Sequence, residues 1–226
     1  MSEWMLIELW HASLETLWMV IASGFFAFVF GLPLAVILFA TKHPRLWQKP
    51  MLHHSLEVVV NTLRSFPFFI LMIALMPLTR ILIGTSIGTN AAIVPLSIAA
   101  IPFVARLMEN TFNELSDGLL EAAQAMGATP WHIIIKVILP ESWAGIIQAQ
   151  VVTLITLVSY SAMAGAVGGG GLGSMAFNEG YQRFNLPILI ITVILLIVFV
   201  QIIQMIGNYC SRRFDVFTGT KEGGTS

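Results

Sequence analysis

Long apolar runs without a single charged side chain dominate the pattern of this chain. Residues 16–41, 65–79, 81–105, 142–178 and 184–211 contain no Asp, Glu, Lys or Arg. A bilayer core about 30 Å thick is crossed by roughly 20 helical residues. The pattern therefore predicts several membrane-spanning helices, with the charged segments between them at the membrane surfaces.

The runs divide into five predicted spans. The turn GTSIGTN (84–90) separates the second span from the third, and the glycine-rich AGAVGGGGLG (164–173) breaks the helix at the end of the fourth. Pro67 and Pro102 are expected to kink their helices. The expected fold is an all-α integral membrane protein with spans at 16–40, 58–83, 90–108, 143–164 and 186–209.

The two ends of the chain are expected to lie outside the spans. The first residues carry Glu3, Glu8 and Glu15 where a signal peptide would be positively charged. Their spaced apolar residues predict that 1–15 is an amphipathic segment at the interface. The span domain then covers 16–209, and 210–226 is a cytoplasmic tail whose last residues, TGTKEGGTS, are expected to be disordered.

Orientation follows from Lys and Arg, which accumulate on the cytoplasmic side of membrane proteins. With the N-terminus outside and five spans, the C-terminus is inside, and of the 11 Lys and Arg residues only Arg80 and Arg183 remain outside. The other nine are then cytoplasmic: Lys42, Arg45, Lys49, Arg64, Arg106, Lys136, Arg212, Arg213 and Lys221.

The composition argues against catalysis or ion coupling by the chain itself. It is 57% hydrophobic and 10% charged with a net charge of -1, which gives no case for nucleic acid binding. No predicted span has a carboxylate or His near its middle, where such groups usually mark function. The five histidines are expected in loops or interfacial segments, and the HH pair at 53–54 is not spaced as a metal site. A membrane chain with several spans and no such groups looks like a transporter that has no energy source of its own. Another protein would then have to drive it.

A polar, turn-rich module interrupts the apolar runs between the third and fourth spans. The stretch EAAQAMGATPWHIIIKVILP (121–140) predicts a helix over 118–126, capped by Ser116 or Asp117 and ended by Gly127. A second helix is expected to begin with Thr129 as its cap and Pro130 as its first residue, and to end at Pro140. Physics alone leaves open whether the module is an ordinary loop or a docking element for a partner.

The module resembles the EAA loop of ABC-transporter permeases. That pattern reads E-A-A, three residues, G, nine residues, I, one residue, L-P, and Val137 stands here for the usual Ile. The resemblance implies that the cytoplasmic loop 116–140 docks on an ATPase, with Glu121 to Gly127 as the coupling surface and Pro140 turning the chain back to the membrane. The matching positions are Glu121, Ala122, Ala123, Gly127, Leu139 and Pro140.

Further stretches resemble the methionine-uptake permeases of Gram-negative bacteria: residues 61–80, 84–109, 160–173 and 180–184. This resemblance implies a type I ABC importer permease of the inner membrane, paired with a second copy of itself. It further implies two cytoplasmic ATPase subunits that bind ATP-Mg and a periplasmic methionine-binding protein. The chain itself would then have no catalytic residue, metal or cofactor.

The end of the fourth span supplies candidates for the translocation path. The flexible thioether of Met163 suits a gate that yields to a methionine side chain, although it can equally fill core space. GGGGLG formally fits a nucleotide-binding fingerprint but lacks the strand and helix around it, so a tight bend that packs or gates is expected. The alternatives are an importer for another amino acid, a stand-alone channel and a membrane-embedded hydrolase. The candidates are Tyr160, Ser161, Met163, Gly168, Gly169 and Gly170.

Overall fold

The computed structural model describes the backbone of residues 3–218 and the side chains of residues 5–214. Within these bounds every regular element is a helix. The elements are α1 (Glu3–Lys42), α2 (Pro50–Ser65), α3 (Phe68–Ala74), α4 (Met76–Ile83), α5 (Thr89–Asn113), α6 (Asp117–Ala125), α7 (Pro130–Ile133), the π-helical turn η1 (Ile134–Ile138), α8 (Leu139–Glu141), α9 (Trp143–Ala166), α10 (Gly171–Met175), the π-helical turn η2 (Ala176–Gln182) and α11 (Leu186–Thr218).

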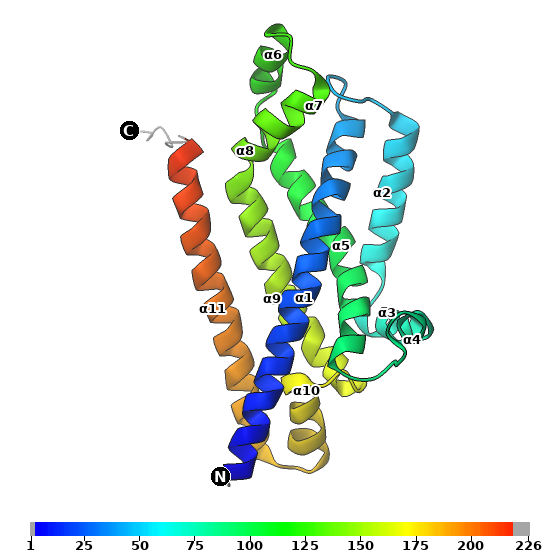
Figure 1. Ribbon diagram of the computed structural model, residues 1–226, viewed down its shortest axis with the longest axis vertical. Helices are drawn as coiled ribbons and strands as arrows, with labels where there is room; N and C mark the ends of the chain where they lie inside the picture. Colours follow the sequence, from blue (N-terminus) through cyan, green and yellow to red (C-terminus); the bar gives the residue numbers. More distant parts are fainter. Residues whose placement is uncertain (1–2, 219–226) are drawn as a thin grey trace.

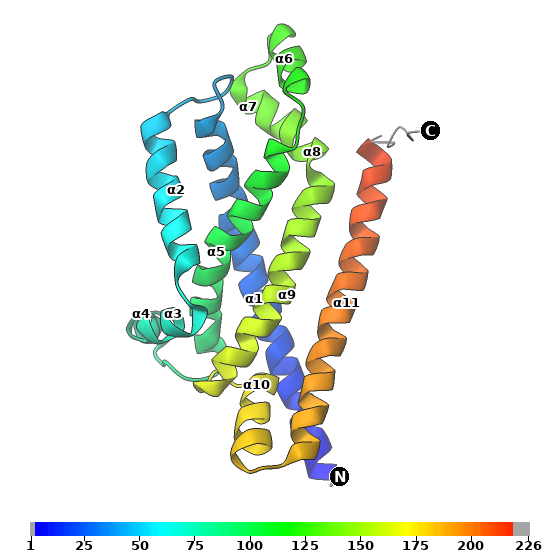
Figure 2. The ribbon, with the colours of Figure 1, turned by 180° about the vertical axis from the view of Figure 1, so that it is seen from behind.

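Four long helices, α1, α5, α9 and α11, run along the long axis of the molecule (Figure 1). The short helices α6 and α7 lie at one end together with the C-terminal end of α11, and α10 lies near the other end with the N-terminal end of α1. We call these the α6 end and the α10 end. The reverse view shows α9 between α5 and α11, so the chain forms one elongated bundle (Figure 2).

Close contact between α1 and α5 forms the centre of the bundle. Phe39 of α1 meets Phe112 of α5 edge to face, with ring centroids 5.8 Å apart, and both are fully buried. A Cβ on Gly31 would lie 2.3 Å from Val104 Cγ1, so only glycine permits this approach. Small residues at crossings are how membrane helices pack closely when lipid is as apolar as their side chains.

Within the described part of the chain, four single helices are long and apolar enough to cross a membrane: α1, α5, α9 and α11. The second predicted span, 58–83, is not one continuous helix, but α2 and α3 together are apolar enough to cross as one span broken by a 101° bend. The kink expected at Pro67 is therefore confirmed, whereas the expected bounds are not. Here α2 ends at Ser65, α3 leaves at a 101° bend, and α4 follows. The break follows from Pro67, because Phe66 before it takes an extended backbone with φ −71° and ψ 130°.

Two predicted boundaries also differ. Residues 3–15 do not form a separate segment, since α1 runs without a break from Glu3 to Lys42. No Gly or Pro occurs before Gly24 to interrupt it. At the other end α11 extends past the expected limit at 209 to Thr218, and residues 219–226 of the expected disordered tail lie outside the described part of the chain.

Helix α2 begins at the α6 end and points away from it (Figure 1), and it carries polar groups along the outside of the bundle. His53 and His54, expected in a loop, lie within α2. His53 Nδ1 is 3.2 Å from the Leu38 carbonyl oxygen, and its Nε2 is 3.6 Å from Glu57. Arg64 is at the C-terminal end of α2, so its expected place at the cytoplasmic surface was also wrong.

Candidate functional site

The first half of the 116–140 module has the predicted helices and glycine turn, but the predicted cap of the first helix does not form. Helix α6 begins after Ser116, whose backbone is extended but whose side chain makes no capping bond. Gly127 ends the helical stretch in a left-handed conformation with φ 80°, which glycine adopts without steric cost. The Thr129 hydroxyl accepts a bond from the backbone N–H of His132 at 3.4 Å, and Pro130 opens α7. The two-helix organisation with a glycine turn is therefore confirmed.

The second half departs from the prediction at Pro140, which does not end the helical path. Helix α7 passes through the π-helical turn η1 into α8, which contains Pro140, and only Ser142 separates α8 from α9. Since Pro140 has no N–H, any helix through it must omit one bond. The π-helical turn just before it is where regular α-helical bonding is already interrupted.

A long-range contact that sequence reasoning missed holds the module in place. Arg45, in the connection between α1 and α2, forms an ion pair with Glu121 and lies 3.7 Å from Asp117. Gln124 Nε2 donates to the Arg45 carbonyl oxygen at 2.7 Å. Trp47 stacks on Trp131 with ring centroids 5.8 Å apart. The polar, aromatic stretch HPRLWQK (43–49) was the one sequence signal for this contact.

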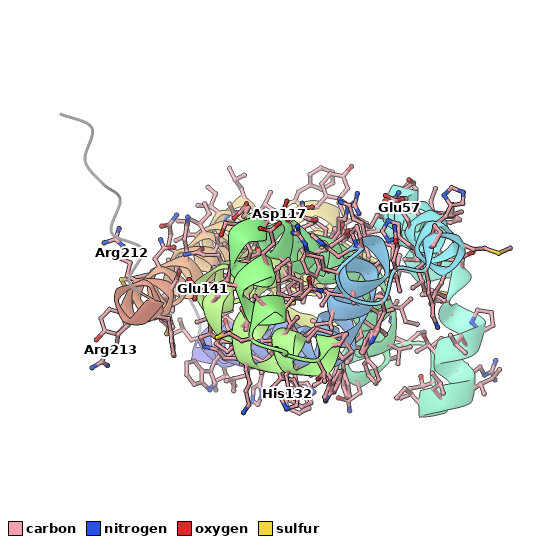
Figure 3. All side chains as sticks on the ribbon, turned by 90° about the horizontal axis from the view of Figure 1, so that it is seen from above. Glu57, Asp117, His132, Glu141, Arg212 and Arg213 are labelled. Carbon is pink, nitrogen blue, oxygen red and sulfur yellow. The ribbon has the colours of Figure 1, made fainter. Side chains whose placement is uncertain are left out.

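The module has a buried face and an exposed face. Leu120, Ala123 and Ile133 are buried against the bundle, whereas Ala122 and Ala125 are exposed and Met126 is 82% exposed. Viewed from the α6 end, Asp117, His132 and Glu141 lie between Glu57 of α2 and the arginines Arg212 and Arg213 of α11 (Figure 3). The exposed end of α6 thus combines apolar, small and acidic side chains. Such a surface suits a short helix that binds in the groove of a partner protein.

The candidates on α9 occupy different surroundings. Tyr160 stacks on Phe68 of α3, with centroids 4.2 Å apart and planes 2° apart. Ser161 is buried and donates to the Val158 carbonyl oxygen at 2.7 Å, so its hydroxyl is engaged within its own helix. Met163 is 48% exposed on the outside of the chain. Of these three, Tyr160 lines a cavity, of about 160 Å³.

The glycine segment after α9 is a tight connection between elements. Gly168 accepts a backbone bond from Gly88 at 2.8 Å, and a Cβ on Gly169 would lie 2.8 Å from the Ala164 carbonyl oxygen. Gly170 has φ 81° and lies against Glu15 and Thr89. The expected break in the helix is confirmed, and these three glycines lie where backbones pack closely.

The described residues contain no group of three or more His, Cys, Asp or Glu placed to hold a metal ion. Ion pairs gather instead near the α6 end. Arg106 lies 2.7 Å from the buried Glu109 and 3.5 Å from Glu57. These ion pairs join α2 to α5 and hold the two helices together.

The sequence and fold match known proteins along most of their length. A family model described as binding-protein-dependent transport system inner membrane component matches residues 27–216. A Vibrio cholerae protein described as "Probable D-methionine transport system permease protein" is 53% identical over 204 residues, covering 90% of this chain and 91% of its own. The D-methionine transport system permease protein of Escherichia coli (strain K12) is 49% identical over 165 residues, covering 73% of this chain and 76% of its own.

Solved structures of ABC transporters contain chains with a similar fold. A structure of the MetNI methionine ABC transporter in an inward-facing conformation contains a chain that is 46% identical and superposes with a TM-score of 0.93, covering 95% of this chain and 99% of that one. An amino acid ABC transporter solved with histidines has a chain with a TM-score of 0.76 at 18% identity, which supports the shared fold alone.

Proposed function

Since the chain belongs to the family of binding-protein-dependent transport system inner membrane components, we propose that it is the membrane subunit of an ATP-driven methionine importer. Its relatives in Vibrio cholerae and Escherichia coli are described as D-methionine transport system permeases. The chain is a permease subunit, so ATP hydrolysis belongs to a partner, and no catalytic residue or cofactor is assigned to it. The observation that carries the proposal is the match over nearly the whole chain, together with the exposed tip at α6.

The tip Glu121–Gly127 is the proposed contact with the ATPase. Its smooth Ala122 and Ala125 surface and projecting Met126 suit insertion into a groove. Force applied there would reach the bundle by two routes. One is covalent, through α7, η1 and α8 into α9, with Leu139 and Pro140 on the path. The other is the Arg45 contact, which joins α6 to the connection between α1 and α2.

The proposed assembly holds two copies of the chain and two ATPase subunits that bind ATP-Mg, with a periplasmic methionine-binding protein at the α10 end. In this arrangement the chain lies in the bacterial inner membrane, with its N-terminus periplasmic and its C-terminus cytoplasmic. Closure of the ATPases would move the bundles from inward-open to outward-open. The proposed lining or gate of the path is formed by Tyr160, Met163 and the glycines at 168–170. Ser161 is buried and bonded within its own helix, so it acts by supporting these neighbours.

Uptake of labelled methionine into proteoliposomes, with the cognate ATPase and binding protein, tests the function. Methionine should accumulate only when ATP is present. Accumulation of a different amino acid in place of methionine would contradict the assigned substrate. Uptake by the chain without any ATPase would contradict the proposal of an ATP-driven importer.

The coupling surface has its own test in the same assay. Glu121→Lys and Gly127→Trp should each lower ATP-driven uptake at least about tenfold. The first breaks the pair with Arg45 and reverses the charge at the tip, and the second places a bulky ring at a left-handed position of the turn. The matched control is Glu114→Lys, an exposed carboxylate between α5 and α6 that lies outside the tip and outside both routes. Equal uptake by all three variants would contradict the assignment of the tip.

A further inference from the structure

Arg64 occupies a place in the bundle that neither the charge pattern nor the coupling scheme explains. Helix α2 begins at the α6 end, and a rise of about 1.5 Å per residue puts Arg64 about 21 Å beyond Pro50 along the helix. The hydrocarbon core of a bilayer is about 30 Å thick. Figure 1 shows α2 ending about halfway along the molecule, just before α3.

The neighbours of Arg64 confirm this depth independently. It lines the cavity of about 160 Å³ together with Phe68, Leu71, Ala99, Phe103 and Tyr160. Ala99 and Phe103 flank the middle of the 25-residue helix α5, which spans the bundle. Arg64 is exposed on the surface of the single chain, so its guanidinium group lies on an open face of the bundle at mid-span rather than at a membrane surface. A cation at this depth is costly and usually serves a transported ion or substrate.

No hydrogen bond or ion pair joins the Arg64 side chain to any other residue that the structure describes. Glu57, on the same helix, is about 10 Å nearer the α6 end and is already 3.5 Å from Arg106 and 3.6 Å from His53. Glu15 accepts the Gly171 N–H at 2.7 Å and so is held at α10. The carboxylates of the described side chains therefore leave Arg64 without a counter-ion.

A second copy of the chain does not supply a counter-ion for Arg64. Two copies with the same membrane orientation are related by an axis perpendicular to the membrane, and such an axis keeps every residue at its own depth. The partner's Arg64 would arrive at the level of Arg64, which repels, whereas its carboxylates would remain at their own levels. The remaining source of an anion for Arg64 is then a molecule that enters beside this exposed face.

We propose that Arg64 binds the carboxylate of the transported amino acid at a mid-membrane subsite, with the stacked Phe68 and Tyr160 beside its side chain. A guanidinium offers two parallel N–H donors to a carboxylate, and the remaining lining is largely apolar or aromatic. The Tyr160 hydroxyl adds the one other side-chain polar group among the residues that line the cavity. The site thus fits an α-amino acid with an apolar side chain, and it rests on the proposed import of amino acids.

The test replaces the charge and then restores it chemically. Cys210 is the only cysteine in the sequence, so Arg64→Cys is made in a Cys210→Ser background and reconstituted with the ATPase and binding protein. The labelled solute is whichever amino acid the Cys210→Ser complex imports, which separates this test from the identity of the cargo. Arg64→Cys should lower uptake between about 10-fold and 100-fold, the loss expected for a charged hydrogen-bonded contact.

Treatment with 2-aminoethyl methanethiosulfonate, which attaches a positive group to the thiol, should restore part of the uptake. The neutral methyl methanethiosulfonate should not. Arg80→Cys, treated identically, is the matched control, because Arg80 is an exposed arginine of α4 away from the cavity. Unchanged uptake in Arg64→Cys, or equal rescue by the neutral reagent, would overturn the proposal while leaving methionine import by the parent complex intact.

Discussion

Gly165 shows most directly how one residue limits the packing of the bundle. A Cβ on Gly165 would lie 2.2 Å from Ser174 N and 2.5 Å from the carbonyl carbon of Gly173, both backbone atoms of α10. Since backbone atoms cannot rotate away as a side chain does, Gly165→Ala should lower the free energy of unfolding by at least about 2 kcal/mol. Thermal unfolding of the purified chain in detergent measures this.

Gly118→Ala is the matched control. Gly118 lies in α6, where a Cβ would meet no atom within 4 Å, and its φ is not positive. The alanine should therefore be neutral or stabilise by up to about 1 kcal/mol through helix propensity. A loss of stability at Gly118 as large as at Gly165 would contradict the steric explanation.

His43 predicts a pH effect at the junction of α1 and the module. Burial lowers the pKa of His43 below its ordinary value of 6.5, with Arg45 and Lys42 lowering it further and Asp117 opposing them. The unfolded chain therefore takes up this proton first as the pH falls. Its contribution to stability is intact above pH 6.5 and is lost as the pH drops below that value.

The measurement compares thermal unfolding at a series of pH values for the natural chain and His43→Gln. The natural chain should lose more stability between neutral and acidic pH than the variant. The difference between the two curves isolates His43 from the other histidines. Parallel curves would show that His43 titrates alike in both states.

At the residue scale, the sequence predicts those features whose causes are local. Gly127 and Thr129 have the predicted roles because a left-handed turn and a helix cap depend on neighbouring backbone alone. The Arg45 and Glu121 pair joins residues far apart in the chain. Nothing in either local sequence specifies the other partner, so this contact required the three-dimensional structure.

At the scale of elements, the attachment of α10 to α1 provides the next prediction. The first two amides of α10 donate to α1: Gly171 N to Glu15 at 2.7 Å and Leu172 N to Thr16 Oγ1 at 2.8 Å. Thr16 and Leu172 are buried. Thr16→Val keeps the shape but leaves the Leu172 N–H unpaired, which should cost about 1–3 kcal/mol of unfolding free energy.

Thr156→Val serves as the comparison, because the Thr156 hydroxyl only bonds back to the Val152 carbonyl of its own helix at 2.9 Å. That variant should change unfolding in detergent little. If Thr16→Val is equally mild, water must replace the hydroxyl at Leu172, and α10 is not held to α1 by this bond.

The predicted spans are confirmed where composition alone decides, and the kink expected at Pro67 is present, but its size was not predicted. Uncharged length identified α1, α5, α9 and α11. Charge-free length could not show that Phe66 and Pro67 turn the chain by 101°, because α3 is as apolar as a span. Pro140 was expected to end its helix, but the helical path continues through it after the π-helical turn η1.

At the scale of the whole molecule, the arrangement of charge predicts which end faces the cytoplasm. Lys42 ends α1 at the α6 end, and Arg45 and Lys49 follow it in the connection to α2. Arg212 and Arg213 of α11 lie at the same end. Moving Arg64 to mid-span removes one residue from the cytoplasmic charges but leaves the bias intact. The family assembly itself, with its second copy and its partners, came from resemblance and not from hydropathy.

The orientation is tested with two single cysteines in the Cys210→Ser background. Met126→Cys places a thiol at the 82% exposed tip of the α6 end, and Phe184→Cys places one at an 89% exposed position between η2 and α11. A membrane-impermeant maleimide should label Phe184→Cys in intact cells, and Met126→Cys only after the membrane is broken. Because ATP is inside the cell, labelling of Met126→Cys from outside would separate the α6 tip from any ATPase and refute the coupling mechanism at its first step.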